Sequence, residues 1–141
     1  MPQKSYKKIF RKYPVQTAYL FGSRARGKAG KLSDYDFAVL LDEKKVSEKQ
    51  YSKYQLEIIS DLLKEIKTDH IDLVILNNSK TPLFLKYNVI KEGKIIYEKN
   101  KTAESERKNL EFHILRRWLD EQYFEKAWSD VYVHQLAKGV F

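Results

Sequence analysis

The chain has no cysteine, no internal repeat and no apolar run that approaches the length of a membrane span. Without cysteine, the protein has neither a disulfide framework nor a thiol nucleophile. Residues 1–13 are basic but lack the apolar centre of a signal peptide, so we expect a cytoplasmic protein that makes no membrane contact. No low-complexity linker marks a domain boundary, and 141 residues suit a single domain, 1–141, with one core.

Basic residues outnumber acidic residues, with 27 lysines and arginines against 19 aspartates and glutamates, for a formal net charge of +8. This balance suits an anionic ligand, RNA or an acidic protein surface. Most of the lysines, however, are typical of solvated helix faces, as in 44–53. We therefore do not expect direct nucleic-acid binding.

The spacing of apolar residues predicts an α/β (α+β) fold with a small mixed sheet of three or four strands. Strands are predicted at 17–21, 35–41 and 70–76, with a fourth, edge strand at 94–98. Helices are predicted at 5–13, behind a capping box at 47–50, from 81 to Gly93, and from 103 to about 130. The core of the domain then spans about 15–98.

The turn after the first predicted strand has the composition of a phosphate-binding turn. Gly22 permits a tight turn and close approach of the backbone to a ligand. Ser23 can cap a following helical turn, whose free N–H groups favour an anion. Arg24 adds positive charge beside the turn and is expected to contact phosphate or to organise the turn.

Two carboxylates open the second predicted strand. Asp34 and Asp36 are two residues apart, so their side chains point to the same face of an extended chain. Two such carboxylates repel each other unless a cation lies between them. Mg²⁺ prefers a few carboxylates together with phosphate oxygens of a substrate.

A third carboxylate, Asp72, is the only acid within the third predicted strand. An acid buried among aliphatic residues is costly unless it is paired or bound to metal, and this composition leads us to expect a buried Asp72. If this strand lies beside the 35–41 strand, three carboxylates converge and can hold one or two divalent ions. The three histidines, His70, His113 and His134, lack the spacing of a metal cluster, and we expect ordinary structural roles for them.

The motif Gly22-Ser23, then Asp34-x-Asp36, then Asp72 resembles the nucleotidyltransferase superfamily that includes DNA polymerase beta. Within that superfamily, the stretches Gly-Ser-Arg-Ala-Arg-Gly and Ser-Asp-Tyr-Asp resemble the minimal nucleotidyltransferase antitoxins, over about 15–98. The resemblance implies a polymerase-beta-like fold, with ATP contacted by Gly22, Ser23, Arg24 and Ser33. It implies Mg²⁺ held by the catalytic residues Asp34, Asp36 and Asp72.

The same resemblance implies a partner and a reaction. The chain would be the antitoxin of a type VII toxin–antitoxin pair and would transfer AMP from ATP to a tyrosine of a HEPN ribonuclease toxin. Two alternatives stay open: transfer to a small molecule or an RNA end, and a non-catalytic antitoxin that blocks its toxin by contact.

Apolar and aromatic residues occupy more than one stripe of the predicted C-terminal helix, from Leu110 to Trp128. A surface helix on a small domain needs only one apolar face. The surplus indicates either a protein partner or a helix that folds over the sheet and is buried on both sides.

Overall fold

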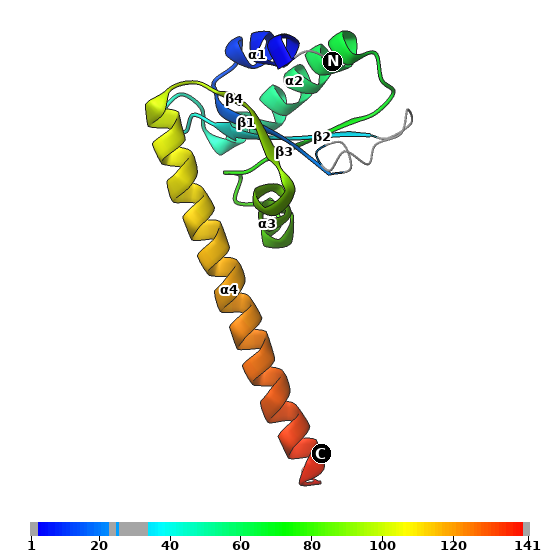
Figure 1. The fold of residues 1–141 in the computed structure, drawn as a ribbon, viewed down its shortest axis with the longest axis vertical. Helices are drawn as coiled ribbons and strands as arrows, with labels where there is room; N and C mark the ends of the chain where they lie inside the picture. Colours follow the sequence, from blue (N-terminus) through cyan, green and yellow to red (C-terminus); the bar gives the residue numbers. More distant parts are fainter. Residues whose placement is uncertain (1–2, 23–24, 26–33, 140–141) are drawn as a thin grey trace.

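The computed structural model describes residues 3–22, 25 and 34–139. A four-stranded mixed sheet, in the order β3-β2-β1-β4, forms the centre of the domain (Figure 1). The strands are β1 (Val15–Phe21), β2 (Tyr35–Leu41), β3 (Ile71–Ile75) and β4 (Lys94–Glu98). β1 pairs antiparallel with β2 and with β4, whereas β2 and β3 are parallel. The mixed sheet and the edge position of β4 are as predicted.

Two helices cover one face of the sheet: α1 (Gln3–Arg11) and α2 (Tyr51–Ile66) (Figure 1). Ser47 precedes a short 3₁₀ turn (Glu48–Gln50) that leads into α2, and its backbone N–H donates to the Gln50 side chain, one half of the predicted capping box. Ile58 and Leu62 of α2 are fully buried against the sheet. Lys67 ends α2 in a left-handed conformation, with φ of 58°.

The opposite face packs against α3 (Leu83–Glu92) and the first part of α4 (Lys101–Ala137) (Figure 1). A second, smaller apolar cluster forms here around Tyr19, Ala38 and Val89. Tyr87 of α3 stacks on Trp118 of α4, with ring centroids 4.4 Å apart. Between these two helical layers the sheet is covered on both faces.

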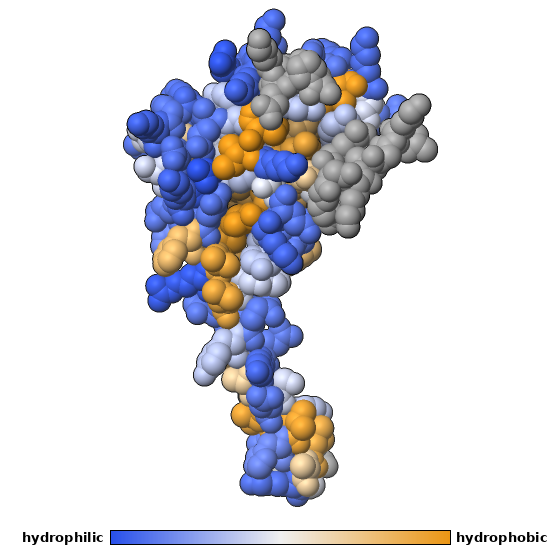
Figure 2. Space-filling view, viewed as in Figure 1, coloured by the Kyte–Doolittle hydropathy of each residue, from blue (hydrophilic) through white to orange (hydrophobic). Residues whose placement is uncertain are grey.

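The α4 helix is longer than predicted and leaves the domain as a projecting arm (Figure 1). Asn100 caps its start by accepting a hydrogen bond from the Ala103 N–H at 2.8 Å. Past Trp118, the large apolar side chains of the helix are exposed, as at Tyr123 (78 %) and Phe124 (71 %). Figure 2 shows apolar side chains gathered at the distal end of the arm. The alternative in which the whole helix folds over the sheet is therefore wrong.

Among the described residues, no helix combines the length and the apolarity needed to cross a bilayer.

Candidate functional site

Three carboxylates meet at one end of the β2–β3 pair. The parallel register places Asp36 of β2 directly opposite Asp72 of β3, and Asp34 immediately precedes β2. Side chains opposite each other in a parallel pair lie on the same face of the sheet. The pairing of these two strands, on which the convergence of the acids was conditional, is present. The predicted juxtaposition of the acids follows from it.

Gly22 brings the end of β1 against this group of acids. Its φ of +74° lies in the left-handed region, which favours glycine. A Cβ atom built at this position would overlap the Asp36 Oδ2 atom, so a side chain here would require the Asp36 carboxylate to move. The turn therefore needs glycine both for its backbone conformation and for the close approach of backbone to carboxylate.

The other members of the predicted phosphate-binding turn, Ser23, Arg24 and Ser33, lie outside the described residues. Their proposed nucleotide contacts stay predictions.

Among the described residues, the His70 imidazole offsets only part of the negative charge around Asp36. Burial raises the pKa of Asp36, and the neighbouring Asp72 and Asp34 carboxylates raise it further. A raised pKa means that the ionised carboxylate is disfavoured in its folded surroundings. A bound divalent cation would remove this penalty, and carboxylate oxygens are the ligands that Mg²⁺ prefers.

Asp72 is exposed, contrary to the expectation of a buried acid. Its side chain is 55 % accessible, although Ile71, Leu73 and Ile75 on the opposite face of β3 are buried. The reason is topological: β3 is an edge strand, so its outward-facing acid has a neighbouring strand on one side only. An exposed carboxylate is available to a ligand without any rearrangement of the core.

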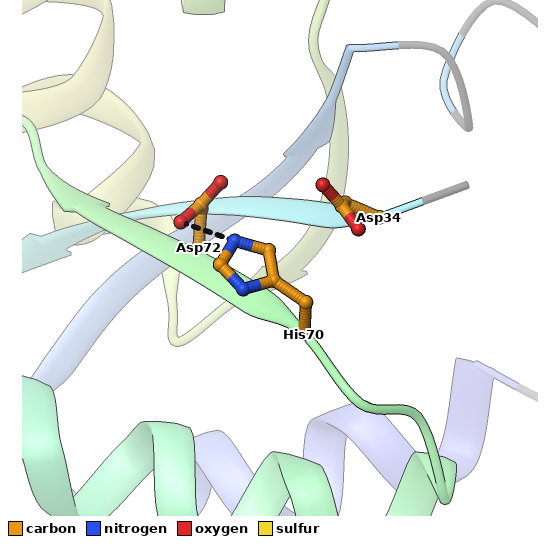
Figure 3. Close-up of side chains that lie close together, drawn as sticks. All are labelled: Asp34, His70 and Asp72. Atoms are coloured by element: carbon orange, nitrogen blue, oxygen red, sulfur yellow. Dashed lines mark hydrogen bonds and ion pairs between the residues drawn. The ribbon is translucent and has the colours of Figure 1, made fainter. Parts of the chain in front are cut away.

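His70 belongs to the site and was missed in the sequence. Its Nε2 atom lies 3.0 Å from the Asp72 Oδ1 atom, and hydrogen bonding to that carboxylate raises the pKa of the imidazole (Figure 3). Ligand atoms of Asp34, His70 and Asp72 all lie within 4.8 Å of one another. The spacing His-x-Asp at the start of a strand was the available signal, because it places both side chains on one face.

A hollow of about 330 Å³ opens beside the acids. Its lining includes both Asp36 and Asp72, together with apolar side chains from β1, β3 and α3 such as Phe21, Val74 and Leu85. The carboxylates thus border a concave surface that is partly apolar, as small-molecule sites usually are.

A mixed sheet that carries paired acids beside a glycine turn defines a protein with the polymerase-beta-like nucleotidyltransferase fold. The family model described as "Polymerase beta, Nucleotidyltransferase" matches residues 4–102. The chain belongs to this family.

Among curated proteins, the chain is similar to the protein adenylyltransferase MntA of Aphanizomenon flos-aquae (strain 2012/KM1/D3). The two are 36 % identical over 83 residues, which cover 56 % of this chain and 54 % of that protein. The chain therefore spans about half the length of this relative.

Solved structures extend the likeness to almost the whole fold. A chain in the crystal structure of a toxin–antitoxin with AMP-PNP superposes with a TM-score of 0.71 at 23 % identity, over 92 % of this chain and 97 % of that one. A chain in the complex of the tri-AMPylated Shewanella oneidensis HEPN toxin with MNT antitoxin gives a TM-score of 0.65 at 21 % identity, over 91 % and 92 %. At these identities, the likeness establishes the fold.

Proposed function

We propose that this chain is an antitoxin that transfers AMP from ATP to a tyrosine hydroxyl of a HEPN ribonuclease toxin and so neutralises it. The observation that carries the proposal is the meeting of Asp34, Asp36 and Asp72 beside the Gly22 turn, in a chain of the nucleotidyltransferase family. The adenylyltransferase name of the MntA relative supports AMP as the transferred group.

In this proposal, the turn binds the triphosphate and the acids hold the metal. Gly22 offers its backbone to the phosphates, and we assign Ser23, Arg24 and Ser33 to the same ligand. Asp34, Asp36 and Asp72 would hold one or two Mg²⁺ ions. Bound Mg²⁺ would neutralise charge on the α-phosphate and on the departing pyrophosphate.

The reaction forms one bond and breaks one. The tyrosine oxygen attacks the α-phosphorus of ATP, the bond from that phosphorus to the β-phosphate bridging oxygen breaks, and pyrophosphate leaves. The hydroxyl proton passes to an acceptor at the site, for which the exposed carboxylate of Asp72 is the best placed. Most of the rate enhancement would come from positioning and from charge stabilisation.

A protein acceptor accounts for the projecting helix. The distal part of α4 exposes Phe124, Trp128 and Val131, whose apolar area nothing in the described chain covers. Aromatic side chains are enriched in the centres of protein interfaces. Transfer to a small molecule or an RNA end does not by itself account for such an arm. The arm therefore favours a macromolecular acceptor, and the solved HEPN toxin complex favours a HEPN toxin.

The experiment is label transfer to a purified HEPN protein, taken from the adjacent reading frame where that frame encodes one. Purified chain, that protein, Mg²⁺ and α-phosphate-labelled ATP should give a labelled toxin with lost ribonuclease activity, and Asp36→Asn should give neither. Label on small molecules or RNA without any label on the toxin would contradict the protein acceptor. Neutralisation that survives Asp36→Asn would instead indicate an antitoxin that acts by contact alone.

A further inference from the structure

The ring of His70 lies among the carboxylates in a way that a structural histidine does not require. It precedes β3 directly, is exposed, and turns its Nε2 atom toward Asp72 rather than toward the core (Figure 3). Asp34 approaches from the start of β2, so the imidazole and two carboxylates converge from neighbouring strands.

The distances among these groups are close to those of one coordination sphere. In octahedral geometry with bonds of about 2.1 Å, adjacent ligand atoms lie about 3.0 Å apart and opposite ones about 4.2 Å apart. The separation of His70 Nε2 and Asp72 Oδ1 is 3.0 Å, and all three ligand atoms fall within 4.8 Å of one another. A cation bound to all three groups therefore requires only that their ligand atoms come within about 4.2 Å of one another.

The donor set decides which cation is favoured. Carboxylates alone suit Mg²⁺, whereas an imidazole nitrogen is a donor for first-row transition metals, and Mn²⁺ is the one of these that also accepts a set made mostly of oxygen ligands. We propose that His70 is a direct metal ligand together with Asp34 and Asp72, and that it makes the site prefer Mn²⁺ over Mg²⁺. This inference rests on the proposed metal site but does not depend on the acceptor or on AMP transfer.

The test is metal binding to the full chain without nucleotide. Calorimetric titration with MnCl₂ should show at least about tenfold weaker binding for His70→Ala, the usual size of an effect on a metal site, with a smaller loss for MgCl₂. His70→Asp, which replaces nitrogen by oxygen, should retain Mg²⁺ binding and lose the preference for Mn²⁺. The double variant His113→Ala/His134→Ala, at two exposed positions on α4, is the matched control and should bind both ions as the wild type does.

Pulsed electron paramagnetic resonance of the Mn²⁺-loaded chain gives an independent readout. Wild type and the α4 double variant should show the nitrogen hyperfine coupling of a directly bound imidazole, and His70→Ala should lack it. Absence of that coupling in the wild type would overturn the proposal, even if His70→Ala binds metal less tightly, because His70 would then act only through Asp72. If the Mn²⁺-loaded wild type shows imidazole coupling but transfers no AMP to a HEPN protein, the proposed function is contradicted and the assignment of His70 as a metal ligand is retained.

Discussion

Asp36 carries its charge in surroundings that disfavour it, because the carboxylate is partly buried and lies near Asp72 and Asp34. The ionised form destabilises the folded chain relative to the unfolded chain, where the pKa is near its ordinary value of about 3.9. We expect Asp36→Asn to abolish transfer and yet to raise the free energy of unfolding at pH 7, without divalent cations, by about 0.5–2 kcal/mol. Urea unfolding of the wild type and of Asp36→Asn in the presence of EDTA measures this difference in the free energy of unfolding.

The pH dependence of the gain follows from the sign of the pKa shift. As the pH falls through the folded-state pKa of Asp36, the wild-type carboxyl becomes neutral, and the difference between the two proteins should vanish below about pH 4. Asp120→Asn, at an exposed position on α4, is the control and should change stability little at any pH. A less stable Asp36→Asn protein at pH 7 would contradict the electrostatic argument.

Gly22 and Gly139 offer a matched pair for separating backbone strain from steric conflict. Both have a positive φ, +74° and +70°, but a Cβ atom meets Asp36 at Gly22 and meets nothing within 4 Å at Gly139. We expect Gly22→Ala to abolish nucleotide binding and to destabilise the fold by about 1–3 kcal/mol. Gly139→Ala should shift thermal unfolding slightly and leave binding unchanged. Equal effects of the two changes would mean that contact with Asp36 is unimportant.

At the level of single residues, the sequence singled out the three acids and made their convergence conditional on the pairing of two strands, but it misjudged the surroundings of Asp72 and His70. The aliphatic composition of β3 led us to expect a buried Asp72, yet its exposure depends on the order of the strands, which no local pattern encodes. His70 was overlooked because His70 and Asp72, two residues apart, form a cluster only together with Asp34, which lies at the start of another strand.

The α4 helix is fixed to the sheet by a partly buried ionic network. The Arg107 Nε donates to Glu98 Oε2 of β4 at 2.6 Å, and its Nη1 donates to Glu111 Oε1 at 3.2 Å. Glu111 also accepts from the Tyr19 hydroxyl of β1 at 2.7 Å, which links the helix to a central strand. The direction in which α4 leaves the domain therefore depends on Arg107, whose side chain is only 12 % exposed.

Arg107→Ala should lower the free energy of unfolding by about 3–5 kcal/mol, because two partly buried carboxylates lose their common cation. The control is Lys108→Ala on the same turn, which removes an exposed pair with Glu104 and should change stability by less than about 0.5 kcal/mol. Urea unfolding monitored by tryptophan fluorescence distinguishes the two. Similar losses in both variants would show that the network contributes little.

Helix and strand positions were predictable where hydrophobic period and local signals agreed, as in α2, with its buried stripe, and in β4 after Gly93. The ends were less accurate. The first helix stops at Arg11 rather than Tyr13, because a residue before proline avoids the helical conformation. The last helix passes the predicted end near 130, since 129–137 contain neither glycine nor proline, and it stops shortly before Gly139.

On the scale of the whole molecule, a three-layered domain carries a projecting helical arm (Figure 1). The two parts differ in how much of their apolar surface is buried. The domain buries two apolar clusters on the two faces of its sheet. The arm beyond Trp118 is apolar on more than one side and has no amphipathic stripe to bury within the described chain. A helix that is apolar on several sides is stable in water only when a partner covers it. In the proposed function, the acids therefore carry out the chemistry and the arm binds the toxin.

A chain ending at Asp120 tests this division directly, because it keeps the Tyr87–Trp118 stack and removes the exposed arm. Since the removed side chains are almost all exposed, we expect the thermal midpoint of the truncated chain to stay within about 2–4 °C of the full chain, as for a change below ~1 kcal/mol. Mn²⁺ and ATP binding by calorimetry should be unchanged. Association with the HEPN toxin in size-exclusion chromatography, and transfer of label to it, should be lost. A truncated chain that still modifies the toxin at the full rate would move the recognition surface from α4 to the domain itself.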